Sequence, residues 1–201
     1  GGNILKEIIN NPKKLVYITI VLILVYEIPY QFKEIKSIFQ YNFDLVNDLK
    51  YILIWSRIIP LLYFILLISK FKVKLSVTNF ILVLYYIINS KRVYDIYFYF
   101  ADTTSQSVSD LLRYSMITSL PSFIAITIFL IIIFYSKINK KYLNLMSGIC
   151  LTICLLHFFY TMKVFAPNID IGLKYSDDLY LIPMILYFRL YAINKFKERK
   201  I

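Results

Sequence analysis

Long apolar stretches separated by short polar segments dominate the chain. Two stretches, Tyr114 to Ser136 and Tyr142 to Met162, contain no charged residue, and each is long enough to supply the about 20 apolar residues of a membrane-crossing helix. A third is uncharged from Leu75 to Ser90 and continues as an aromatic segment to about Phe100. Three more stretches carry one charged residue each. The pattern predicts six transmembrane helices, at approximately 15–32, 51–69, 75–100, 114–136, 142–165 and 179–194.

The polar segments between these stretches alternate in charge. Every second segment is basic, and the basic ones are 1–14 (net +2), 70–74 (+3), 137–141 (+3) and the tail from Lys195 (+3). The others are neutral or acidic, namely 33–50 (net 0), 101–113 (−1) and 170–178 (−2). Because Lys and Arg accumulate in cytoplasmic loops, we expect both termini in the cytoplasm and the protein in a cell membrane.

Composition agrees with this topology. Hydrophobic residues are 59% of the 201 residues, where soluble proteins have about 45–50%, and a soluble globule of this size could not bury them all. The predicted fold class is therefore all-α: a polytopic integral membrane protein, a compact bundle of about six helices in a single domain over 1–201. A net charge of +11 would favour nucleic acid in a soluble protein. Here the basic residues lie in short clusters between apolar runs, so we expect the lipid bilayer as partner and no nucleic acid.

Ionisable residues within the spans are the best pointers to function. At about 1.5 Å of rise per residue, those in four of the spans fall toward the outer half, and only Arg189 lies deeper or further in. This common level predicts an outer-facing polar pocket. Cationic side chains outnumber carboxylates there, which favours a small anionic or zwitterionic solute. The ligand-binding candidates are Glu27, Arg57, Tyr85, Asn89, Arg92, Asp95, His157 and Lys163.

Structural pairing explains the same charges without a pocket. Arg92 and Lys163 have long stems that can reach the outer interface. Lys91 and Asp95 are four residues apart on one helix and can pair. A lone Arg57 within a span costs about 2.5–3.5 kcal/mol, so we expect a partner for it, and Glu27 on the preceding helix is the first candidate.

His157 is the single histidine of the chain, and it lies on a stripe of small and polar residues. Such stripes pack against other helices, which predicts a packed, hydrogen-bonded histidine. Contact with a ligand or a proton relay is the second interpretation. The third is a Cys154–His157 nucleophile–base pair of an intramembrane peptidase, although no glycines for an oxyanion hole lie nearby. The stripe consists of Ser147, Cys150, Cys154, His157 and Thr161.

Motifs for metals and cofactors are missing from the sequence. One histidine and no dense carboxylate cluster argue against a catalytic metal. The glycine-rich motifs of nucleotide-binding proteins and the motif of α/β-hydrolases do not occur. We therefore expect no metal and no cofactor.

Two families share the predicted topology of six spans with both termini inside. The chain resembles the substrate-binding subunits of energy-coupling-factor transporters in size, although Leu15 to Tyr26 lacks the alanine stripe of that family. Its ending, with Ala166-Pro167 and Ile182-Pro183, is similar to that of the twin-arginine translocase core subunit. That family carries a glutamate just before the fourth-span proline, where this chain has Leu120. The sequence therefore assigns the chain to neither family.

Three functional hypotheses follow from the sequence. The first is a multi-pass protein that binds or transports a small solute through the outer pocket, as a subunit of a larger transporter with a cytoplasmic motor. The second is a non-enzymatic accessory, assembly or immunity protein that binds another membrane protein. The third is an intramembrane enzyme.

Overall fold

The computed structural model describes residues 2–29, 32, 36, 49, 57–69, 75–103, 106–166 and 177–198. These residues contain seven α-helices and no strand, which confirms the all-α class. The helices are α1 (Gly2–Ile9), α2 (Pro12–Leu22), α5 (Ile58–Ile68), α6 (Leu75–Thr103), α7 (Gln106–Tyr135), α8 (Lys140–Val164) and α10 (Asp178–Glu198). A π-helical segment, η1 (Ile23–Glu27), continues α2.

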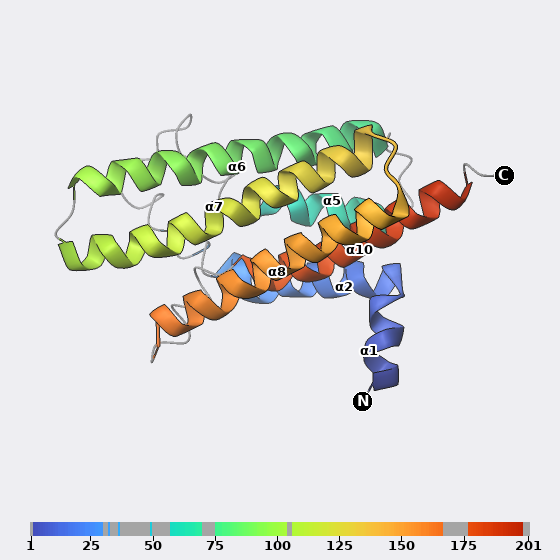
Figure 1. Cartoon of the computed structure of the whole chain (residues 1–201), viewed down its shortest axis with the longest axis horizontal. Coiled ribbons are helices and arrows are strands. Elements are labelled where there is room, and N and C mark those ends of the chain that lie inside the picture. The colour runs from blue at the N-terminus through green and yellow to red at the C-terminus, as the bar shows by residue number, and fades with distance from the viewer. Residues whose placement is uncertain are drawn as a thin grey trace.

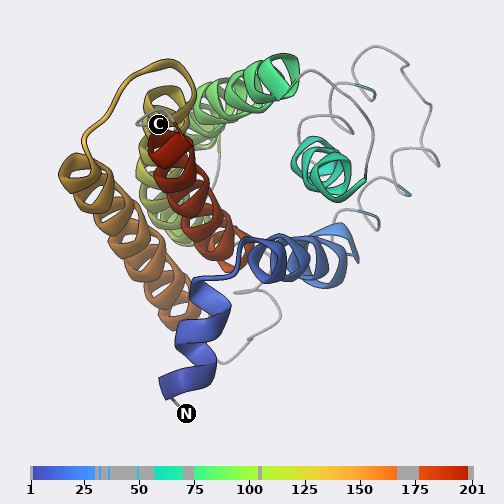
Figure 2. The same cartoon turned by 90° about the vertical axis from the view of Figure 1, so that its right-hand side faces the viewer.

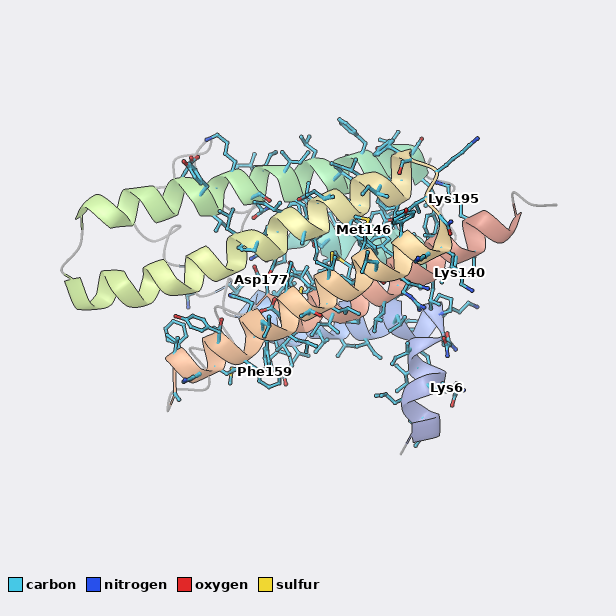
Figure 3. All side chains as sticks on the ribbon, viewed as in Figure 1. Lys6, Lys140, Met146, Phe159, Asp177 and Lys195 are labelled. Carbon is cyan, nitrogen blue, oxygen red and sulfur yellow. The ribbon has the colours of Figure 1, made fainter. Side chains whose placement is uncertain are left out.

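The helices after α1 run along the long axis of the molecule, and successive helices point in opposite directions (Figure 1). As a result α2, α6 and α8 begin at the same end at which α5, α7 and α10 finish. We call this the basic end, because its described lysines include Lys13, Lys140 and Lys195, the last two of which are labelled there in Figure 3. Helix α1 lies across the bundle at this end.

Helix α10 occupies the middle of the bundle. It contacts α2, α7 and α8, and the end-on view shows it between them (Figure 2). Contact on several sides explains why its sequence is apolar around much of its circumference. Its fully buried side chains include Tyr180, Leu181, Met184, Ile185 and Phe188.

Within the described residues, one helix is both long and apolar enough to cross a membrane, namely α8. The segments Ile58–Ile68 and Leu120–Tyr135 are apolar but shorter. Helices α6 and α10 are long, but tyrosines and charged residues lower their hydropathy. Helices therefore occur where the apolar pattern predicts all six spans, while membrane crossing by any of them stays a prediction.

Candidate functional site

A group of polar side chains, all buried except the half-buried Asp177, gathers where α5 and α10 begin. We call it the polar cluster, and it consists of Arg57, Tyr85, His157, Thr161, Asp177 and Asp178. His157 and Asp178 lie equally far along their helices from Lys140 and Lys195, about 25 Å in each case. Figure 3 accordingly shows Asp177 well away from the basic end. The cluster thus lies at one level, toward the opposite end of the bundle.

Arg57 precedes α5 in an unusual backbone conformation. It is the N-cap residue with φ 57° and ψ 17°, in the left-handed region, and no other non-glycine residue of the described chain has a positive φ. Pro60 explains why the helix begins here, because its missing N–H removes the bond that would extend the helix backward to residue 56. The sequence predicted Arg57 inside a span, whereas the structure places it at the start of a helix. Such conformations cost about 1–3 kcal/mol and gather at functional sites.

The Arg57 guanidinium binds a carboxylate from the far end of the sequence. It forms an ion pair with Asp177, in which Nη2 contacts Oδ2 and Nε donates to Oδ1 at 3.3 Å. Two parallel contacts of this kind make a strong, directional pair. Nη1 donates to the Tyr85 hydroxyl at 3.3 Å. The expected partner was Glu27, whose side chain lies outside the described residues.

His157 is held by side chains on both edges of its ring. Nδ1 contacts Oδ2 of Asp178, and Nε2 lies 3.2 Å from Oγ1 of Thr161, one turn further along α8. Side chains of His157 and Asp178 are almost fully buried. Asp178 stands in the first turn of α10, where the helix dipole stabilises a negative charge. The prediction of a packed, hydrogen-bonded histidine is therefore confirmed.

The arrangement does not favour a Cys154–His157 nucleophile–base pair. Both ring nitrogens of His157 have other partners, and the fully buried Cys154 thiol interacts with Asp178 and Ser122. A nucleophile needs contact with its base and access for a substrate. The described geometry shows neither for Cys154.

The remaining candidates fall into two groups. Asn89 is buried near the cluster, but its amide donates to the Tyr85 carbonyl of its own helix at 3.0 Å. Asp95 is exposed and pairs with Lys91 at 2.5 Å, which confirms local pairing for these two residues. Lys163 is exposed and Arg92 is half-buried. The structure thus brings together Arg57, Tyr85 and His157, while Asp95 and Lys163 point outward because long or locally paired side chains reach the surface at little cost.

Depth along a helix did not predict the contacts of Arg189, Asp177 and Asp178. Arg189, predicted further in, donates from Nε to Asn144 Oδ1 on α8 at 3.1 Å. From the sequence, Asp177 and Asp178 were expected only as charged residues of the outer segment 170–178. Their position directly before an apolar helical run, where carboxylates favour helix N-termini, is the signal that could have identified them.

Two buried hydroxyls next to the cluster are unusual. Among the residues that the structure describes, the Tyr180 and Ser122 hydroxyls make no well-formed hydrogen bond, although the Tyr86 hydroxyl lies close to the first and the Cys154 thiol close to the second. Tyr180 lies within electrostatic reach of Arg57 and Asp177. A buried polar group without a partner costs about 1–3 kcal/mol, so these hydroxyls offer binding capacity to a molecule that enters the cluster.

The Tyr85 hydroxyl gives a modest, testable contribution. We expect Tyr85→Phe to lower the unfolding free energy by about 1.5–3 kcal/mol, because it removes one hydrogen bond to a guanidinium without changing shape. Denaturant titration in detergent measures the loss, and Tyr142→Phe, at an exposed tyrosine, is the matched control. A change no larger than that of the control would mean that Tyr85 does not hold Arg57.

Metal binding has no support in the described part of the chain, where no group of three or more His, Cys, Asp or Glu side chains could hold an ion. The comparisons with known proteins give no family either. No family model, no curated protein and no solved structure matches the chain.

Proposed function

We propose that the chain is a multi-pass membrane protein with six crossing helices and both termini in the cytoplasm, which binds a small zwitterionic solute at the polar cluster. The alternating helix directions support the topology (Figure 1). They bring Lys13, Lys140 and Lys195 to one end, as the excess of Lys and Arg on the cytoplasmic side requires.

The outer faces of the helices suit a hydrocarbon solvent. Large apolar side chains recur at intervals of three or four residues on the exposed faces of α6 and α7, where Phe80, Leu84 and Ile87 match Ile124, Ile128 and Ile131. Soluble monomers rarely expose contiguous apolar stripes of this kind. In lipid the same stripes carry no cost, which favours crossing by α6 and α7 as well as α8.

The charges of the cluster favour a zwitterion over a simple anion. The expected excess of cations is not found in the buried cluster, because Lys163 is exposed and two carboxylates accompany Arg57. A guanidinium and carboxylates side by side complement a ligand that carries a carboxylate and an ammonium group. The observation that carries the proposal is the presence beside these charges of the buried Tyr180 and Ser122 hydroxyls, which make no well-formed hydrogen bond within the described residues.

Thermal unfolding of the purified protein tests this function. We expect α-amino acids or betaines to stabilise it, by about 2.7 kcal/mol at a concentration 100 times Kd, and simple carboxylates or amines at equal concentration to do so less. Tyr180→Phe removes only the hydroxyl and should weaken the shift, while Tyr142→Phe should leave it unchanged. Equal responses to all three ligand classes, or none, would contradict the proposal.

One observation favours the accessory protein as the second candidate. Arg57 pairs with Asp177 and His157 with Asp178, so the charges stabilise one another without a ligand. On this alternative the cluster is structural and the function lies in binding another membrane protein. A stoichiometric protein partner that co-purifies, together with no stabilisation by zwitterions, would favour it.

A further inference from the structure

Helix α1 differs in direction from every other described helix. It lies across the bundle axis at the basic end, and both views show it projecting to one side (Figures 1 and 2). It is joined to α2 through Asn10 and Asn11, and Pro12 then begins α2. Because an isolated helix of eight residues is not stable in water, something must hold α1 in this position.

Side-chain contacts at the corner between α1 and α2 help to hold α1 in this position. The Asn10 amide donates to the Lys6 carbonyl at 2.9 Å, and Asn11 Oδ1 accepts from the Lys14 backbone N–H at 3.2 Å. Lys14 Nζ then reaches back to Glu7 Oε1 at 2.5 Å. This ammonium lowers the pKa of the Glu7 carboxyl. The corner is therefore a defined bend that fixes α1 at a steep angle to the bundle.

The sequence of α1 divides into two faces. Ile4, Leu5, Ile8 and Ile9 share one side of the helix at the spacing of an amphipathic pattern. The first two are highly exposed, at 66% and 63%, so the bundle does not cover them. Ile8 packs against the bundle core and Ile9 is half-buried, so the exposed part of the face is the first turn with Ile4 and Leu5. An exposed apolar turn on a helix across the end of a bundle is the geometry of an interfacial helix.

The polar side of the corner is basic. A shallow hollow is lined there by Lys6, Glu7, Asn10, Asn11, Pro12 and Lys13. Figure 3 places Lys6 at the same end of the molecule as Lys140 and Lys195. Ammonium and amide donors gathered in this way bind the phosphate oxygens of lipid headgroups.

We infer that α1 lies in the plane of the cytoplasmic leaflet, with Ile4 and Leu5 inserted at headgroup depth and Lys6 and Lys13 bound to anionic phospholipids. The inference rests on the membrane placement proposed above. It adds a specific partner, an anionic lipid surface. It also explains the bend between α1 and α2, which turns the chain from the membrane plane in α1 to the membrane normal in α2.

Spin labels on the full chain in vesicles test the inference. A nitroxide is attached to a single cysteine that replaces Leu5, Asn10 or Ile128, in a background with Cys150→Ala and Cys154→Ala. Each labelled protein is placed in phosphatidylcholine vesicles with or without phosphatidylglycerol. With the anionic lipid, we expect the label at Leu5 to collide with oxygen more than with a water-soluble nickel complex, and the label at Asn10 to do the reverse. Lys6→Gln and Lys13→Gln should each weaken docking of α1 about fivefold, whereas Lys163→Gln should not.

The label at Ile128, on the exposed apolar face of α7, separates the two claims. If it is in lipid while the label at Leu5 collides with nickel in both kinds of vesicle, the inference about α1 is wrong and the proposed topology stands. Equal docking of α1 in both vesicles would exclude the anionic partner. If the label at Ile128 itself collides mainly with nickel, the membrane placement fails, and the inference fails with it.

Discussion

Replacing Arg57 with glutamine is expected to lower the unfolding free energy by about 3–5 kcal/mol. The substitution leaves the Asp177 carboxylate inside the bundle without its bidentate partner, and removing one member of a buried ion pair costs about this much. Denaturant titration of the purified protein in detergent measures the loss. Lys91→Gln breaks the exposed pair with Asp95 and serves as the matched control, with an expected cost of about 0–1 kcal/mol.

A double-mutant cycle shows whether the effect belongs to the pair. Arg57→Gln and Asp177→Asn together should cost less than the sum of the single changes, because no uncompensated charge remains. Arg57→Gly removes the same ion pair but suits the left-handed backbone at this position, so it should be about 1 kcal/mol more stable than Arg57→Gln. Strict additivity in the cycle would show that Arg57 and Asp177 do not interact.

Replacing His157 with leucine is expected to cost a similar amount, about 3–5 kcal/mol, since Asp178 would be left as a buried carboxylate without its imidazole. Asp178→Asn in the same background should recover much of the loss by removing the charge. Thr161→Val, which removes only the contact with Nε2, should cost about 1 kcal/mol. Losses for Thr161→Val as large as those for His157→Leu would contradict a dominant His157–Asp178 pair.

The approximate positions of the helices could be predicted from the sequence, because long apolar runs are bounded by charged segments. The boundaries were less accurate: α7 begins at Gln106, inside the segment 101–113 expected to connect two spans, because its polar residues continue the helix beyond the apolar run. The expected helix at 142–165 is observed as α8 and the one at 179–194 as α10. The left-handed residue before α5 could not be foreseen in the same way, since the pattern from 51 to 69 shows one continuous apolar run. Pro60 was the available sign that a helix begins there.

The membership of the polar cluster was only partly predictable. Depth along each helix selects Arg57, Tyr85 and His157 for one level, because residue number fixes the rise. Depth does not predict which carboxylate binds Arg57. That contact joins positions 120 residues apart, and it depends on how α10 packs between its neighbours. Asp95 lies at the same level but on the exposed face of α6. In a helix with apolar residues on all sides, the sequence pattern does not show which side faces the bundle.

Cysteine accessibility on intact cells tests the six-span topology most directly. Single cysteines replace Lys72, Lys140, Thr104 or Lys174, one in each of four connecting regions, in a background that lacks Cys150 and Cys154. With both termini in the cytoplasm, an impermeant thiol reagent should label positions 104 and 174 and should reach 72 and 140 only after the cells are permeabilised. Labelling at 72 or 140 on intact cells would contradict the topology.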